Sequence, residues 1–272
     1  MKKLLCLLAL PLLLVGCSAF HEREEQASSS LVDFLYPNNR DYVEQNPATP
    51  HLTLPLNVGI AFVPDSQFSK LNLTAKRKQE ILSQVKREFS ELNYINRIEI
   101  ISDNYLRDGG GFDNLEQLSR LYNVQVMALV SYDQIARSTQ NNAALLYWTI
   151  AGMYVIPGDE NTTQTFVDTA LFDIKSKQLL MRAPGISKIE SYSTAVGLDD
   201  TFYQNSDKGF DAAVTDMVTN LKTELETFKV RVTEEQIAEV SYSSNYSGGS
   251  IAWWSLSALF AFSLIRRKRR KA

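Results

Sequence analysis

The chain is poor in cysteine and histidine, the two side chains that most often carry nucleophilic and metal chemistry. It has two of each, and Cys6, Cys17, His21 and His51 all lie in its first 51 residues. Disulfides, cysteine-ligated zinc and cysteine nucleophiles are therefore excluded from the rest of the chain. A Ser-His-Asp triad and a histidine metal site are excluded there for the same reason. Most hydrolase mechanisms are thereby removed, and we expect a protein that is not an enzyme and holds no cofactor or metal.

Basic charge is also scarce once the two ends of the chain are set aside. The net charge of the 272 residues is −3, but residues 1–16 carry two lysines and residues 250–272 carry six basic side chains, with no acidic ones. The part between them has 20 basic and 31 acidic side chains, a net charge of −11. So acidic a surface disfavours binding to nucleic acid or anionic lipid. We expect its contacts to depend on shape and apolar patches.

The amino terminus has the layout of a secretory signal peptide. Positive residues at its start precede an apolar segment, Leu4–Val15, which is shorter than the roughly 20 residues of a membrane-spanning helix. Leu14, Val15 and Gly16 stand directly before Cys17, and this group resembles the lipobox of bacterial lipoproteins. The alternative is an ordinary signal peptide that contains a cysteine.

The lipobox resemblance implies a defined route. Leu14, Val15 and Gly16 would be recognised by the lipoprotein signal peptidase, and Cys17 would be acylated, anchoring the mature chain in membrane lipid. Ser18 stands where lipoproteins retained at the inner membrane typically carry aspartate. The resemblance therefore implies passage through the lipoprotein processing and export machinery to the outer membrane, on its periplasmic face or at the cell surface.

The carboxyl terminus carries a second signal. Gly248, Gly249 and Ser250 precede an apolar run at 251–265, and a basic tail follows: Arg266, Arg267, Lys268, Arg269, Arg270 and Lys271. As a helix, 15 residues cover about 22 Å of a hydrocarbon core about 30 Å thick, so the run is short for a permanent anchor. The positive-inside rule places the basic tail in the cytoplasm and the rest of the chain on the periplasmic side.

This order of Gly-Gly, short apolar helix and basic cluster resembles the GlyGly-CTERM sorting domain. The resemblance implies cleavage in the region of Gly248, Gly249 and Ser250 by a rhombosortase, a rhomboid-type intramembrane serine protease. A plain carboxy-terminal transmembrane anchor is the alternative. With the lipobox, the chain resembles the rhombotarget lipoproteins, a family defined by both signals, although the matching motifs cover only about 45 residues.

Between the two signals the pattern predicts one α/β domain. Proline-rich and polar residues up to Pro55 are typical of a linker, with 31–36 as a short apolar clip. The predicted organisation is a signal peptide, a polar tether, an α/β domain, a linker and a sorting signal, at residues 1–16, 17–54, 55–232, 233–247 and 248–272. We expect a single small domain with a mixed sheet and two to three amphipathic helices, flanked by the signal peptide, the tether and a C-terminal transmembrane sorting helix.

Hydrophobic periodicity predicts the first elements of this domain in β-α-β-α-β order, at residues 56–64, 74–92, 97–102, 112–122 and 125–132. The first helix should bury Ile81, Leu82, Val85, Phe89 and Leu92 and turn Lys76, Arg77, Lys78, Lys86 and Arg87 to water. The second should bury Leu115, Leu118 and Leu121. Together with the strand at 122–130, this order resembles the small α/β domain of curli-secretion-type and Tol-system periplasmic proteins.

The second half of the domain is predicted to add longer strands at 145–156 and 163–174, an antiparallel partner at 178–182 and a closing helix at 210–228. The segment 145–156 is the most apolar internal one, and Trp148 and Tyr154 are residue types favoured at membrane and protein interfaces. It is interpreted either as a buried strand or as a surface that contacts a membrane or partner.

Two further motifs have structural explanations. The run from Asp108 through three glycines to Asp113 is interpreted as a turn before a helix, because no Gly-Lys-Ser/Thr follows as in a phosphate-binding loop. Asp199, Asp200, Asp207 and Asp211 fit no EF-hand spacing and are interpreted as an acidic loop that caps the last helix.

Three functional hypotheses remain open. The first is a non-enzymatic, lipid-anchored envelope protein that a rhombosortase processes and whose α/β domain is an interaction module. The second is an oligomeric secretion or pore component that uses the apolar segment 145–156. The third is a glycan-active enzyme that depends on two carboxylates alone.

Overall fold

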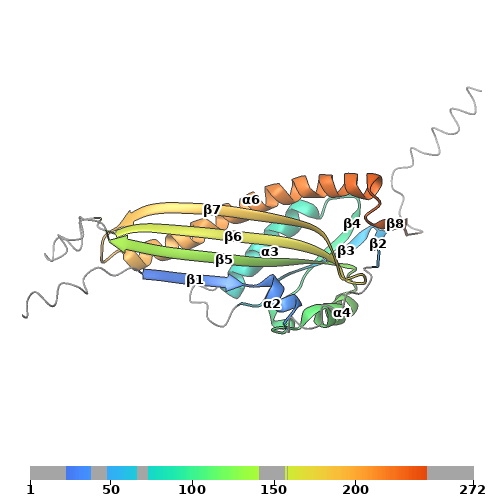
Figure 1. Ribbon diagram of the computed structural model, residues 1–272, viewed down its shortest axis with the longest axis horizontal. Coiled ribbons are helices and arrows are strands. Elements are labelled where there is room, and N and C mark those ends of the chain that lie inside the picture. Colours follow the sequence, from blue (N-terminus) through green and yellow to red (C-terminus); the bar gives the residue numbers. More distant parts are fainter. Residues whose placement is uncertain (1–22, 38–47, 66–72, 141–156, 158, 244–272) are drawn as a thin grey trace, which may run out of the picture.

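A long central strand, β5 (Val126–Gln140), organises the domain. The computed structural model describes residues 23–37, 48–65, 73–140, 157 and 159–243. Along one side, β5 pairs antiparallel with β6 (Asp159–Asp173) over its whole length. Along the other side, its first part pairs in parallel with β3 (Leu56–Phe62), and its second part pairs antiparallel with β1 (Arg23–Ser29). The sheet has the order β4-β3-β5-β6-β7, with β1 continuing the line of β3 beside β5 (Figure 1).

The parallel half of the sheet forms a three-layered body. β3 lies between β4 (Ile95–Ile100) and β5, and α3 (Ala75–Phe89) and α4 (Gly111–Tyr122) connect these strands. One face buries α3 through Ile81, Leu82, Val85 and Phe89. The other face buries α4 and the short helix α2 (Leu31–Leu35) through Leu115, Leu118, Phe34 and Leu35. The predicted β-α-β-α-β order and the docking of the clip at 31–36 are confirmed.

The second half of the sheet extends from the body as an arm. β6, β7 (Gln178–Ser193) and the helix α6 (Leu198–Glu234) run along it with β5 and β1 (Figure 1). At about 1.5 Å per residue, the 37 residues of α6 span about 55 Å. The contact between sheet and helix in the arm is largely polar. Its buried side chains include Gln134, Ser138, Asn161, Thr163, Thr165, Asn205 and Ser206.

Hydrogen bonds satisfy much of this polar interior. The Gln134 amide donates to Thr165 Oγ1 at 2.6 Å and accepts from the Ser206 hydroxyl at 2.5 Å. Nearer the arm's end, Asn161 donates to Ser193 Oγ at 2.9 Å. Such pairing is required because a buried polar group without a partner costs about 1–3 kcal/mol.

The helix α6 packs most closely on the edge strand β7 at Gly185. A Cβ built there would lie 2.1 Å from the Ala213 carbonyl oxygen and 2.4 Å from the Met217 nitrogen, so only glycine fits. The same helix bonds the free edge of the strand. The Asn220 amide donates to the Pro184 carbonyl at 2.7 Å, and Asp216 accepts from the Ile186 amide at 3.0 Å. Because its open edge is covered in this way, β7 is a poorer template for unwanted strand pairing.

At the end of the body opposite the arm, a two-stranded parallel ribbon pairs the segment that precedes β3 with the segment that follows α6. It consists of β2 (His51–Leu54) and β8 (Glu239–Tyr242). The prediction of a tether over 17–54 is therefore wrong for 23–29 and 51–54, which form β1 and β2, and that of a linker over 233–247 is wrong for 239–242. His51 belongs to the ribbon, where its Nδ1 lies 3.3 Å from Glu239 Oε2.

The remaining differences concern helix faces and bounds. Leu121 is 68% exposed, not buried as predicted. The last helix begins twelve residues before the predicted start, so Asp199, Asp200, Asp207 and Asp211 lie on α6 itself and not in a loop before it. The turn before α4 is confirmed, with Gly109 and Gly111 at positive φ. The predicted antiparallel pairing of β6 with β7 is also confirmed.

Among the described residues, no helix combines the length and hydropathy needed to cross a bilayer. The strand predicted at 145–156 lies outside the described residues, as do the predicted signal peptide and sorting tail.

Candidate functional site

The predicted processing sites lie outside the described residues, but the structure fixes where the chain leaves the domain toward them. Cys17 and its preceding Leu14, Val15 and Gly16 lead into β1, whose first residue, Arg23, pairs with Ser138 near the end of β5. Arg23 is held there by an ion pair with Asp199 of α6, and its guanidinium carbon lies 4.9 Å from the Phe202 ring centroid. The amino-terminal segment therefore leaves from the far end of the arm.

The apolar segment 145–156 leaves from the same end. The β5–β6 hairpin stays paired as far as Gln140 and Asp159, the last described residues on either side of it except Pro157. β8, after which Gly248–Lys271 follow in the sequence, lies at the opposite end of the domain (Figure 1). The two ends of the domain thus lead to different predicted segments of the chain.

A cavity of about 540 Å³ lies in the body end, between the sheet, α3, the last third of α6 and the ribbon. Its walls are almost wholly aliphatic and aromatic. They come from Leu52, Leu54, Leu56, Val58, Ile60, Val85, Phe89, Ile95, Ile98, Ala128, Leu171, Leu180, Met181, Leu221, Leu225, Phe228, Val232, Ala238 and Val240. None of the described residues that line it is acidic. A cavity of this size and character lies within the range of small-molecule sites, about 300–1,000 Å³.

Few polar groups line this cavity, and two of them are already engaged. The Thr169 hydroxyl donates to Met217 Sδ at 2.8 Å, and the Thr233 hydroxyl donates to the Lys229 carbonyl at 2.9 Å. The Tyr94 hydroxyl oxygen, in contrast, is buried and makes no hydrogen bond of normal geometry within the described structure. Burial raises the pKa of this hydroxyl, which therefore stays protonated at neutral pH.

Lys229 supplies a positive charge at the rim of the cavity. Its ammonium nitrogen lies 4.7 Å from the Tyr94 ring centroid, and its side chain is 41% exposed. The exposed Glu226, 2.6 Å away on the same helix, hydrogen-bonds the ammonium and raises the pKa of Lys229. The site thus combines an apolar interior with a cation and a buried hydroxyl at one place.

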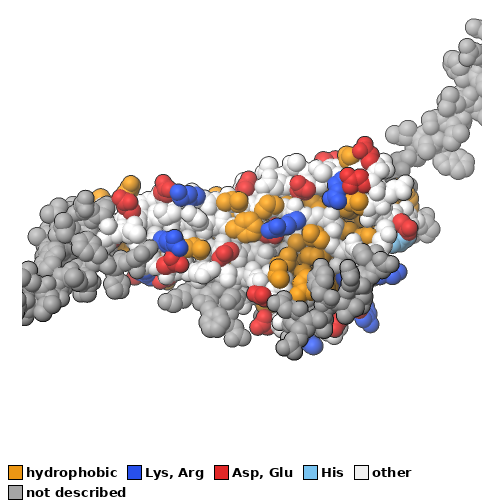
Figure 2. Space-filling view, in the orientation of Figure 1, with side chains coloured by type: hydrophobic (Ala, Val, Ile, Leu, Met, Phe, Trp, Pro, Cys, Tyr) orange, Lys and Arg blue, Asp and Glu red, His pale blue; other side chains and the backbone are white. Residues whose placement is uncertain are grey.

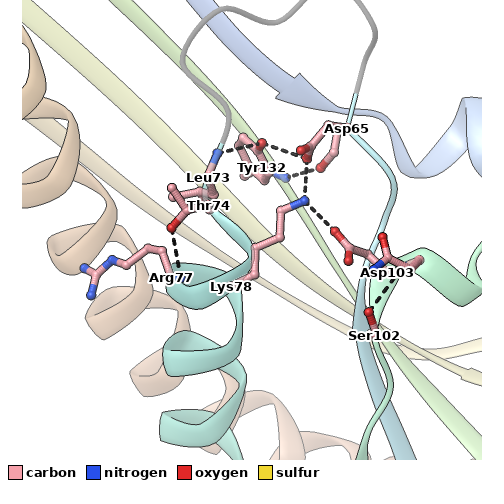
Figure 3. A network of polar contacts seen from close by, with 10 residues as sticks. Asp65, Leu73, Thr74, Arg77, Lys78, Ser102, Asp103 and Tyr132 are labelled. Atoms are coloured by element: carbon pink, nitrogen blue, oxygen red, sulfur yellow. Dashed lines mark hydrogen bonds and ion pairs between the residues drawn. The ribbon is translucent and has the colours of Figure 1, made fainter.

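A second cluster lies at the carboxyl ends of the parallel strands. Asp65 follows β3, Asp103 follows β4, Tyr132 belongs to β5, and Lys78 belongs to the first turns of α3 (Figure 3). The Lys78 ammonium lies 2.8 Å from Asp65 Oδ1 and 2.7 Å from Asp103 Oδ2. The Tyr132 hydroxyl donates to Asp65 Oδ1 at 2.8 Å, and burial beside that carboxylate raises the pKa of Tyr132 well above its usual value.

The prediction that Lys78 faces water is wrong, since the residue is only 5% exposed. The helical spacing contains the missed signal. Lys78 precedes Ile81 by three residues and Leu82 by four, which places it on the buried face of α3. Ligands of open α/β sheets often bind at the carboxyl ends of the strands. Here, however, the ammonium group is held by two carboxylates from within the domain, which fits an internal tie between α3 and the sheet.

The described residues contain no group of three or more His, Cys, Asp or Glu side chains placed to hold a metal ion. On the arm's outer sheet face, Asp168 is buried and pairs with Arg182 at 2.6 Å. Figure 2 shows hydrophobic side chains gathered near the middle of the molecule, while charged groups are spread along the arm.

Comparison with known proteins gives little further guidance. No protein-family model and no curated protein sequence matches the chain. Among solved structures, it is similar to a PelC dodecamer variant from Paraburkholderia phytofirmans, with a TM-score of 0.27 and 10% identity over 74% of this chain and 99% of that one. A second PelC dodecamer from the same organism gives a TM-score of 0.25 and 8% identity, covering 67% and 93% of the two chains. At these scores the likeness carries no argument about assembly or function.

Proposed function

We propose that this protein is a non-enzymatic lipoprotein of the bacterial envelope. It is acylated at Cys17, cut in the region of Gly248 and Gly249 by a rhombosortase, and delivered to the outer membrane or cell surface, where its α/β domain is an interaction module. The observation that best supports this proposal is the position of the two chain exits at opposite ends of an elongated domain.

The lengths of the two segments outside the domain explain why the positions of the exits matter. Arg23 is the sixth residue after Cys17, and Gly248 is the sixth residue after Tyr242. Each segment spans at most about 21 Å when fully extended, while α6 alone spans about 55 Å. A chain held at both ends by one membrane is therefore confined with its long axis near the membrane plane. Cleavage at the body end leaves only the acyl anchor near the arm, and the body becomes free to move away from that membrane.

Intact mass spectrometry of the protein from its native membrane tests this proposal. We expect a mass that runs from acylated Cys17 to about Gly248 or Gly249 in wild-type cells. Deleting the host's rhomboid-type protease should lengthen it by the tail up to Ala272. An acylated chain that ends at Ala272 in both strains would contradict the proposal and indicate a doubly anchored inner-membrane protein.

The arm's geometry favours one second candidate, an oligomeric secretion or pore component. Gln140 and Asp159, between which the apolar segment 145–156 lies in the sequence, form the last described pair of β5 and β6, at the same end of the arm as the exit toward Cys17. A membrane reached by the acyl chain is then within reach of Trp148 and Tyr154.

For this candidate, Trp148→Asp should release a non-acylated Cys17→Ser chain from vesicles of the native lipids, while Tyr242→Asp at the body end should not. Equal vesicle binding by both variants would contradict it.

The third hypothesis, a carboxylate-dependent glycan-active enzyme, gains no support from the contacts of the described residues. Such enzymes need two carboxyl groups that face a substrate about 5–10 Å apart. Asp65 and Asp103 both bind the Lys78 ammonium and are therefore engaged within the domain. We therefore make no enzymatic proposal.

A further inference from the structure

We infer that the cavity in the body end binds a single acyl chain whose anionic head group pairs with Lys229. This inference goes beyond the proposed sorting function and does not depend on it. It concerns a ligand of the domain itself, at the end opposite the predicted acyl anchor.

The cavity walls identify the class of the occupant's tail. Nineteen of the lining side chains are aliphatic or aromatic hydrocarbons or thioethers, and they enclose about 540 Å³. An apolar chain in this space removes the lining hydrocarbon from water and makes dispersion contacts with it. A peptide fits less well, because its backbone amides and carbonyls need partners. Two of the polar lining groups, the hydroxyls of Thr169 and Thr233, are already bonded within the protein.

The rim identifies the head group. Lys229 lies over the Tyr94 ring, and the buried Tyr94 hydroxyl interacts with the same ammonium without a hydrogen bond of normal geometry. An anionic oxygen placed there accepts from both groups, and a charge-assisted hydrogen bond is about twice as strong as a neutral one. Glu226 holds the ammonium at present, and as a 71%-exposed side chain it can turn to water when the ligand enters. A fatty-acid carboxylate and a lysophospholipid phosphate share this chemistry.

Photo-crosslinking of the full-length protein in phosphatidylcholine nanodiscs tests the inference. The probe is palmitic acid with a diazirine near the end of its chain, and the crosslinked peptides are identified by mass spectrometry. We expect labelling in α6 near Leu221–Thr233 and in the ribbon near Leu52, and loss of that labelling when unlabelled palmitate or lysophosphatidylglycerol is added. Competition by palmitate alone or by the lysolipid alone would support the inference and tell the two ligand sources apart.

Two variants test the head-group contact and the apolar cavity separately. Lys229→Gln should lower labelling about two- to fivefold, the size of effect expected for a partly exposed ion pair. The matched control is Lys222→Gln, on the same helix but outside the cavity, where Lys222 pairs with Glu88 at 2.7 Å. It should leave labelling unchanged. Ala128→Phe places a large side chain from β5 in the cavity and should abolish labelling.

Several outcomes would overturn the inference. Labelling confined to the segments outside the described domain, or labelling that excess palmitate does not reduce, would show that the probe reacts from the bilayer and not in the cavity. Equal competition by uncharged hexadecanol, or equal labelling of the Lys229→Gln and Lys222→Gln proteins, would remove Lys229 as the partner of the head group. Because Lys229 is partly exposed and Lys222 is exposed, we expect both variants to fold, which circular dichroism of the two proteins checks.

Discussion

Replacing Gly185 with alanine should lower the free energy of unfolding by about 3 kcal/mol or more. The new Cβ would lie 2.1 Å from the Ala213 carbonyl oxygen and 2.4 Å from the Met217 nitrogen. Both are backbone atoms of α6, so no side chain can turn aside to relieve the overlap. The helix must move away from β7, which also lengthens the bonds from Asn220 to Pro184 and from Ile186 to Asp216.

Two other glycines provide a graded control. At Gly209 the nearest atom is Thr165 Oγ1, 2.6 Å from the built Cβ. This oxygen can move only by a side-chain rotation that breaks its hydrogen bond with Gln134, so the expected loss is about 1–2 kcal/mol. At Gly197 the nearest atom is Thr194 Oγ1, at 3.2 Å, and the expected change is within about 0.5 kcal/mol. Denaturant titration of the full-length proteins, followed by far-ultraviolet circular dichroism, measures all three. Equal stability of the Gly185→Ala and Gly197→Ala proteins would contradict the close packing of α6 on β7.

Replacing Lys78 with methionine should cost about 3–5 kcal/mol of stability, because it leaves two carboxylates beside an apolar side chain. Asp65 and Asp103 approach the Lys78 ammonium at 2.8 and 2.7 Å, and they come from the ends of two different strands. The lost interaction is the tie between α3 and the sheet (Figure 3). The same denaturant titration measures the loss.

Two comparisons identify the cause of that loss. Lys76→Met changes a side chain that is 87% exposed on the same helix and should alter stability by no more than about 0.5 kcal/mol. Adding Asp65→Asn and Asp103→Asn to Lys78→Met removes the unpaired charges and should recover more than half of the lost stability. If Lys78→Met proved as mild as Lys76→Met, the cluster would contribute nothing to the fold. If the triple variant gained nothing over Lys78→Met, lost packing and not unpaired charge would be the cause.

The body of the domain could be predicted because its segments carry their own hydrophobic pattern. Residues 81, 82, 85 and 89 repeat at helical spacing, and α3 is found at Ala75–Phe89. The strand predicted at 125–132 has a continuous apolar run, and β5 is buried on both faces there. Such patterns are local, so they need no knowledge of neighbouring elements.

The arm and the ribbon could not be found in this way. β1 consists of Arg-Glu-Glu-Gln-Ala-Ser-Ser, in which only Ala27 joins the hydrophobic core. It becomes a strand because β5 offers an unpaired edge beyond the end of β3. β2 and β8 are four residues each, and paired residues lie 188 positions apart in the sequence. The stability of these strands comes from partners distant in sequence, which hydropathy does not record.

The candidate cavity was likewise absent from the predictions, although many of its lining residues were assigned to the core. Periodicity indicates that Val85, Phe89 and Leu221 point inward, but it cannot tell whether the space they face is filled. That depends on how far α3, α6 and the ribbon stand from the sheet.

The sequence by itself determined the mixed α/β class, the order of the body's elements, the acidity of the domain and the two terminal motifs from which its route is proposed. These follow from composition and local periodicity, which belong to the chain before it folds. The tertiary structure alone decided that the two exits lie at opposite ends, that Lys78 is an internal ion-pair partner and that an apolar cavity opens beside Lys229. Each of these depends on the distance between segments far apart in sequence, and packing sets that distance.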